Sequence, residues 1–125
     1  MSTLDENKKV GEETQHGRFL TFTIENEVYG IEILYVTEII GIQSITKVPE
    51  VPEYVKGITN LRGKIIPVID VRLKFGREPI EYNDRTCIIV IDINDVSVGL
   101  IVDKVDEVLT FEDGEIAAPP ASKTG

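Results

Sequence analysis

Apolar residues recur at every second position in several short segments of the chain, and a period of two is the spacing of a β-strand. Residues 18–24 (RFLTFTI) alternate in this way, with leucine, phenylalanine and isoleucine on one face. Residues 86–93 (TCIIVIDI) and 96–102 (VSVGLIV) flank Asn94 and Asp95, which both tolerate left-handed turn conformations, and so predict a long hairpin. Further strands are predicted at residues 28–31, 36–45 and 64–69, with another strand or turn at 105–109.

The helical signals are short. Proline is favoured in a first helical turn, so residues 52–56 (PEYVK) predict a one-turn helix with Gly57 as its stop. Asp70 is a suitable N-cap for a second short helix at 71–75. A helical turn at 32–35 is an open alternative, because the apolar residues around it also have helical spacing.

Composition supports the same fold class. The chain of 125 residues has 18 isoleucines and 14 valines but only 7 leucines and 3 alanines. β-Branched side chains suit a pleated sheet better than a helix, so an all-β fold with short helical turns is predicted, of the kind seen in small barrels. Pro67 has no backbone donor and predicts that its strand is an edge or is bulged there.

Charge and residue counts narrow the function. A net charge of −9 disfavours nucleic-acid binding, and one cysteine and one histidine exclude a disulfide framework and multi-histidine or cysteine-based metal sites. No window is apolar enough to insert directly into a membrane, and the polar N-terminus has no signal core, which predicts a cytoplasmic protein. Residues 1–17 predict a disordered leader before a domain at 18–125. A β-rich binding module is favoured over an enzyme.

A hydrolase is the alternative from another class. Asp70 and Asp92 both end the pattern Val-Ile-Asp and could act as paired carboxylates, although Asp70 already has a structural role as an N-cap. Cys87 lies in an apolar strand and is expected to be a buried small hydrophobe, and His16 lies in the leader and is expected to be inert.

Arg62 is the most informative charge. It lies in the predicted turn between Leu61 and Gly63, where an arginine is not needed to reverse the chain. A carboxylate would hold it in place, and Glu38 is a candidate partner. An ordinary surface pair and an arginine that anchors a protein interface are both open at this point.

The segment that contains this turn, KGITNLRGKIIPVIDVR at residues 56–72, strongly resembles the signature of the family of the chemotaxis coupling protein CheW. The similarity covers most of residues 18–120. It includes the segments FLTF, YGI, VTEI and GLIVD, which begin at Phe19, Tyr29, Val36 and Gly99. Seventeen matching residues with this mixture of glycine, proline and charge are specific to the family.

The resemblance implies two small five-stranded β-barrels packed around a shared hydrophobic core. It also implies a non-catalytic adaptor, without cofactor or metal. Such an adaptor links the signalling tip of methyl-accepting chemotaxis receptors to the regulatory domain of the histidine kinase CheA. The coupling domain of CheV or of CheA itself is the nearest alternative.

The resemblance also assigns candidate interface residues. An amphipathic receptor helix is expected to lie in a groove, whose residues on this chain would be Ile33, Val36, Glu38, Gly57, Arg62, Val98 and Leu100. The kinase is expected to contact Ile39, Ile42 and Ile45, with a second contact at 116–121 that closes rings of adaptor and kinase.

The C-terminus departs from the family pattern. Family members usually continue with a loop, a hydrophobic strand and a C-terminal helix, so the domain is expected to be C-terminally incomplete. An unpaired strand edge would then be exposed, and a strand-swapped homodimer is an expectation for such a chain.

Overall fold

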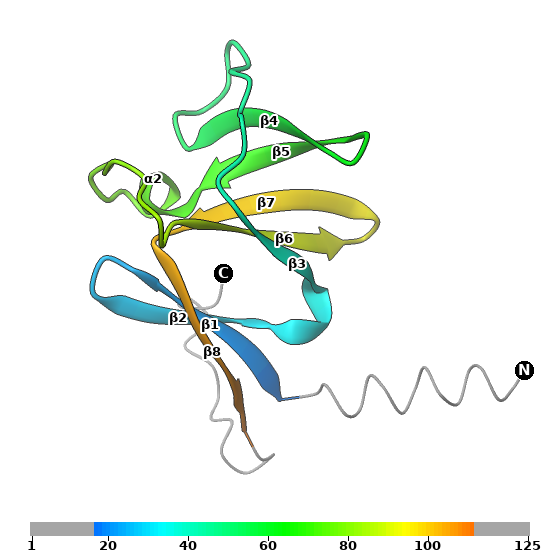
Figure 1. The fold of residues 1–125 in the computed structure, drawn as a ribbon. Helices are drawn as coiled ribbons and strands as arrows, with labels where there is room; N and C mark the ends of the chain where they lie inside the picture. The colour runs from blue at the N-terminus through cyan, green and yellow to red at the C-terminus, as the bar shows by residue number, and fades with distance from the viewer. Residues whose placement is uncertain (1–16, 112–125) are drawn as a thin grey trace, which may run out of the picture.

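The alternating segments form two sheets in the computed structural model, which describes residues 17–111 (Figure 1). The strands are β1 (Arg18–Ile24), β2 (Glu27–Glu32), β3 (Val36–Gly41), β4 (Val55–Leu61), β5 (Lys64–Asp70), β6 (Cys87–Ile93), β7 (Val96–Val102) and β8 (Lys104–Thr110). A 3₁₀ turn, η1 (Ile33–Tyr35), and a one-turn helix, α2 (Val71–Lys74), lie between them. The predicted all-β class is therefore confirmed.

One sheet has three strands in the order β2-β1-β8, and the other has five in the order β3-β6-β7-β5-β4. All neighbours are antiparallel except β5 and β7, which run parallel with Val68 opposite Gly99. In Figure 1 the three-stranded sheet lies below the five-stranded one. Residues 17–111 thus form one sheet of five strands and one of three, and the two closed five-stranded barrels stay a prediction.

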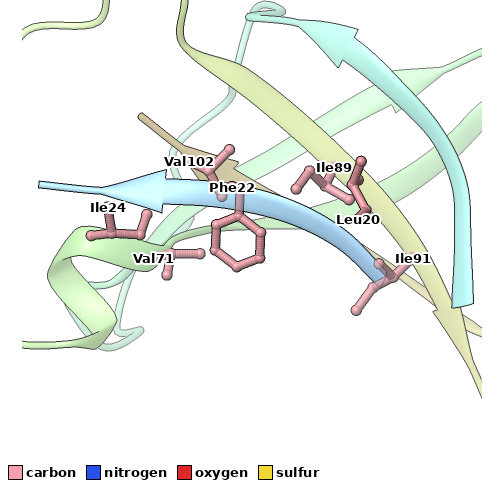
Figure 2. Close-up of a cluster of buried hydrophobic side chains, with 7 residues drawn as sticks. All are labelled: Leu20, Phe22, Ile24, Val71, Ile89, Ile91 and Val102. Carbon is pink, nitrogen blue, oxygen red and sulfur yellow. The ribbon is translucent and has the colours of Figure 1, made fainter. Parts of the chain in front are cut away.

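Strand β6 is buried on both faces and separates two hydrophobic cores. Ile89 and Ile91 pack with Leu20, Phe22, Ile24, Val71 and Val102 in the first core, between the two sheets (Figure 2). Ile88 and Val90 point to the opposite face and pack with Ile66, Val68 and Ile101 in the second core. Successive side chains of a strand point to opposite faces, so an unbroken apolar run is what such a central strand requires.

The five-stranded sheet is curled, because the chain that leaves one edge strand returns to the other. Thr46, which follows β3, forms a two-bond bridge with Ile58 of β4, with N···O distances of 2.8 and 2.9 Å. The hydroxyl of Thr59 also donates to the carbonyl of Ser44 at 2.8 Å. Gly57 permits this approach: its φ is +146°, and a Cβ there would lie 2.0 Å from the Thr46 carbonyl oxygen.

Most local predictions are confirmed, including the Asn94-Asp95 hairpin and the Asp70 N-cap of α2, whose side chain accepts from the Leu73 amide. The helix predicted at 52–56 is wrong, because β4 begins at Val55 and pairs with Ile69 of β5. This long-range pairing outweighs the weak helix-start signal of the proline.

Two other predictions are confirmed only in part. The strand predicted at 36–45 ends at Gly41. Pro67 is inside β5, but the pairing with β7 covers only Val68–Asp70, so the proline lies where β5 is paired with β4 alone. Residues 1–16 of the predicted leader and the second kinase contact at 116–121 lie outside the described residues. Residues 17–111 contain no helix long and apolar enough to span a membrane.

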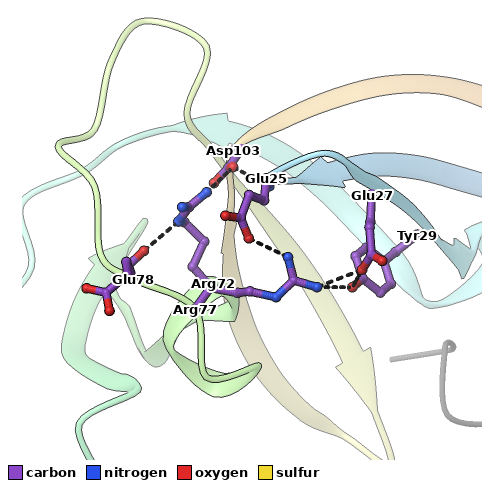
Figure 3. Close-up of polar contacts among 7 residues, drawn as sticks. All are labelled: Glu25, Glu27, Tyr29, Arg72, Arg77, Glu78 and Asp103. Carbon is purple, nitrogen blue, oxygen red and sulfur yellow. Dashed lines mark hydrogen bonds and ion pairs between the residues drawn. The ribbon is translucent and has the colours of Figure 1, made fainter.

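A polar network joins the two sheets at the side opposite the Asn94-Asp95 turn of the long hairpin (Figure 3). Arg77, which follows α2, donates to Glu25 at 2.5 Å and to Glu27 at 2.6 Å on the β1–β2 hairpin. Arg72, only 7% exposed, donates to Asp103 at 2.6 Å, and the same Asp103 oxygen accepts the Glu25 amide. The network therefore ties α2 and the end of β7 to the β1–β2 turn.

We expect Gly57→Ala to lower the free energy of unfolding by about 2–4 kcal/mol, because the new methyl group would overlap the Thr46 carbonyl in a backbone conformation that alanine disfavours. Urea denaturation measures the change. Gly41→Ala is the matched control, since that position is open within 4 Å. Equal stability of the two variants would contradict the close approach.

Candidate functional site

The most informative surface is the mouth of the curled five-stranded sheet. A hollow of about 310 Å³ opens there, and all five strands of the sheet contribute to its lining. The residues that line the hollow, called the mouth below, are Thr37, Glu38, Leu61, Arg62, Lys64, Ile66, Val90, Asp92 and Ser97. Ile66 and Val90 belong to the second core, so the base of the hollow is apolar. The remaining lining is mostly polar or charged, an arrangement suited to recognition rather than to enclosing a small molecule.

The predicted pair of Arg62 and Glu38 is present at this mouth. Arg62 lies in the β4–β5 turn with a φ of +53° and donates from its guanidinium to a Glu38 carboxylate oxygen. The two residues come from opposite edges of the sheet, so the pair spans the mouth. The Arg62 side chain is 69% exposed and that of Glu38 is 27% exposed, which leaves the arginine accessible to a partner.

A β-bulge at Thr37 decides which way Glu38 points. Val36 lies opposite Ile91, whereas Glu38 lies opposite Val90, so one extra residue has been inserted in β3. Because cross-strand neighbours share a face, Val36 points to the first core and Glu38 to the mouth of the second. The Thr37 hydroxyl donates to the Val90 carbonyl at 3.1 Å and stabilises the bulge.

The other predicted receptor residues lie on a different face. They are half-buried and pack against the first core from η1, β3 and β7: Ile33, Val36, Val98 and Leu100. Gly57 is buried at the bridge with Thr46 and leaves little surface for a partner. The structure therefore brings Glu38 and Arg62 together, groups the four apolar residues elsewhere, and gives Gly57 a structural role.

Of the predicted kinase residues, Ile39 lies in the edge strand β3, and Ile42 and Ile45 lie in the segment after it. Ile39 is 43% exposed and Ile42 is 37% exposed, which is unusual for isoleucine next to two cores. Ile45 is half-buried and packs against the second core. Within residues 17–111 the outer edge of β3 has no paired strand, and exposed apolar residues beside such an edge mark a place where another chain can bind.

Sequence reasoning missed a second polar link, which lines the mouth along the neighbouring strands β5, β7 and β6. Lys64 Nζ donates to Ser97 Oγ at 2.7 Å, and Ser97 Oγ donates to Asp92 Oδ1 at 2.5 Å. The contact between Ser97 and Asp92 could have been predicted, because both residues are two positions from the Asn94-Asp95 turn and so lie opposite each other in the hairpin. Lys64 comes from β5, and only the parallel register of β5 on β7 brings it there.

The comparison with known families decides the identity. The model of the CheW-like domain matches residues 18–125. The chain belongs to the CheW-like domain family.

Relatives and a solved structure agree with this family. The chemotaxis protein CheW of Klebsiella aerogenes is 41% identical over 120 residues, which cover 96% of this chain and 72% of that protein. CheW of Helicobacter pylori is 38% identical over 103 residues, covering 82% of this chain and 62% of the relative. The crystal structure of the scaffolding protein TtCheW from Thermoanaerobacter tengcongensis has a TM-score of 0.78 at 42% identity, over 83% of this chain and 71% of that one.

The paired-carboxylate alternative is not supported within this CheW-like domain. Asp70 lies opposite Ile101, and Asp92 lies opposite Ser97, four residues away along the same strand. Four residues of strand span about 13 Å, too far for two carboxylates to share a proton or flank one bond. Asp70 is also engaged, because Tyr82 donates to its second oxygen at 2.8 Å. Cys87 is half-buried rather than buried and packs against the first core.

We expect Tyr82→Phe to lower the free energy of unfolding by about 1.5–3 kcal/mol at neutral pH, because Asp70 is 4% exposed and would lose a hydrogen bond to its carboxylate. Burial, and secondly the Asp70 hydrogen bond, raise the pKa of Tyr82 above its ordinary value of 10. A raised pKa means that the contribution of the neutral phenol is fully present below pH 10 and is lost at higher pH.

The stability difference between wild type and Tyr82→Phe is therefore expected to be constant from pH 7 to 10 and to shrink above pH 10. Chemical denaturation across this range measures it, with the exposed Tyr35→Phe as control. A difference that grows above pH 10 would contradict the assignment.

Proposed function

We propose that this chain is a non-catalytic adaptor of bacterial chemotaxis that couples methyl-accepting chemotaxis receptors to the histidine kinase CheA. Membership of the CheW-like domain family supports the proposal, as do relatives named chemotaxis protein CheW and a related structure described as a scaffolding protein. The adaptor would act in the cytoplasm and reach the membrane only through its partners.

The observation that carries the proposal is the use of both faces of edge strand β3. Glu38 faces the mouth and holds the exposed Arg62, while its neighbour Ile39 lies on the opposite face and is 43% exposed. An adaptor needs two surfaces that can be occupied at the same time, and consecutive residues of one strand provide them. Two contacts held by one rigid element also allow binding at one to influence the other.

The receptor contact would combine a polar anchor with an apolar surface. Arginine is enriched among residues that dominate protein interfaces, and Arg62 is presented on a short turn with its carboxylate partner beside it. Ile33, Val36, Val98 and Leu100 lie on the opposite face, toward the first core, so a receptor helix that met their exposed portions as well as Arg62 would have to reach around the sheet edge. Gly57 would contribute indirectly, by keeping the bridge that sets the curl of the sheet.

The kinase contact would be apolar and would centre on Ile39 and Ile42. Ile45 would contribute indirectly, because it packs against the second core and so holds the segment after β3 in place. The outer edge of β3 is unpaired within the described residues, so the regulatory domain of CheA could approach both its backbone and its isoleucines.

We expect Arg62→Ala and Glu38→Ala each to weaken binding of a receptor signalling-tip fragment by about tenfold, as loss of an interface anchor does. Titration calorimetry with the purified chain measures the affinity. The double variant should bind no more weakly than either single one, since both residues belong to one pair. Arg85→Ala, an exposed arginine before β6, is the matched control. Normal receptor binding by both single variants would remove the site assignment.

We expect Ile39→Ser to weaken binding of the CheA regulatory domain by about tenfold while receptor-tip binding changes less than about twofold. Ile80→Ser is the control, because Ile80 is 42% exposed, almost the same as Ile39, and lies in the loop before β6. Isotope-labelled chain in an NMR titration with the CheA domain should show its largest shifts along β3. Equal losses for both variants would argue against a contact centred on β3.

A further inference from the structure

The link formed by Lys64, Ser97 and Asp92 runs along three neighbouring strands, β5, β7 and β6, and lines the same mouth that the Arg62–Glu38 pair spans. Its middle member, Ser97, is 8% exposed, accepts from Lys64 and donates to Asp92. Both charges of this link are therefore engaged through one nearly buried hydroxyl group. A charge-assisted chain of this kind is stronger and more directional than a surface pair.

Lys64 is joined to Arg62 by a tight turn. Leu61 and Lys64 are the last paired residues of β4 and β5, so the turn consists of Arg62 and Gly63 alone. Both have positive φ, +53° and +86°, which is typical of the two-residue hairpin turns that match strand twist. The Asn60 side chain accepts the Gly63 amide at 2.8 Å and closes the turn further. A group that holds Lys64 therefore also holds the backbone of Arg62.

The positive and negative charges at the mouth come from different strands. Arg62 and Lys64 come from the β4–β5 hairpin, whereas Glu38 and Asp92 come from β3 and β6. Glu38 is opposite Val90, two residues before Asp92 on the same face, and such diagonal neighbours are about 7–8 Å apart. Arg62 thus has two carboxylates within the same mouth. The engagement of Asp92 by Lys64 through Ser97 leaves Glu38 as the partner of the arginine.

We infer that Lys64, acting through Ser97 and Asp92, is a positioning residue that directs Arg62 to Glu38 and so sets the surface offered to the receptor. The inference rests on the proposed function for its effect on binding, but the placement of Arg62 itself is a property of the free protein. Removal of the Lys64 ammonium group would free Asp92 to compete with Glu38 for the guanidinium.

The test uses Lys64→Met, which keeps the length of the side chain and removes the ammonium group. We expect the Arg62 Nε–Hε resonance of the free chain to shift, and receptor-tip affinity to fall about fivefold with CheA-domain affinity unchanged. Ser97→Ala should reproduce both effects. Lys64→Arg keeps the positive charge, so it should leave the Arg62 resonance and the receptor-tip affinity as in the wild type. Lys47→Met, an exposed lysine outside the mouth, is the control and should change neither measurement.

The sharpest outcome comes from a second substitution. If Asp92 competes for Arg62, then Asp92→Asn in the Lys64→Met background should restore both the Arg62 resonance and the receptor affinity. A purely structural role of Lys64 predicts the opposite, because the double variant would lose one more partner of the buried Ser97 hydroxyl.

The remaining outcomes separate the two proposals. An unchanged Arg62 resonance in Lys64→Met would overturn the positioning role, whatever happens to binding. Loss of CheA binding together with receptor binding would make Lys64 a residue of the fold and would also overturn it. A shifted resonance with receptor binding unaffected in both Lys64→Met and Arg62→Ala would sustain the positioning of Arg62 and reject the proposed receptor site.

Discussion

The rest of the structure depends on the burial of β6 on both of its faces. Ile88, Ile89, Val90 and Ile91 are consecutive and all at most 7% exposed, so two layers of apolar side chains must cover this one strand. Burial of each such side chain stabilises the fold by about 1.5–3 kcal/mol. The three-stranded sheet covers one face, and the curl of the five-stranded sheet covers the other. Two cores sharing one strand explain why so short a chain forms two joined units.

The candidate site lies where this apolar run ends. Asp92 follows Ile91 on the same strand, and the polar residues of neighbouring strands gather around it, because beyond this point there is no core left to cover. The bulge at Thr37 turns Glu38 toward the same mouth while Val36 stays in contact with the first core. Packing of the cores and presentation of the charged residues are therefore two results of the same sheet geometry. A substitution that loosens the curl would be expected to disturb recognition without touching an interface residue.

Sequence reasoning succeeded where the signal was local and failed where a distant segment decided the outcome. The residues around the Asn94-Asp95 turn predicted both the two strands of the hairpin and the register in which they pair. Residues 52–56 had an acceptable helix start, yet Val55 pairs with Ile69 and Gly57 lies against Thr46, and neither contact leaves a local trace. The pairing of Arg62 with Glu38 could be anticipated from charge. The hydrogen bond from Lys64 to Ser97 could not be predicted, because a lysine in an alternating strand gives the same sequence pattern whether its side chain faces solvent or a serine.

The sequence by itself determined the short alternating strands, the tight turns, the Asp70 cap and the membership of a family with a specific signature, because each of these depends on residues close together in the chain. Only the tertiary structure decided which strand edges meet, which face Glu38 occupies and which carboxylate each cation contacts. These choices depend on sheet order, on the parallel register of β5 and β7 and on one bulged residue. A shift of a single residue in pairing turns a side chain to the opposite face, so such contacts are set by the assembled sheet and not by the local pattern.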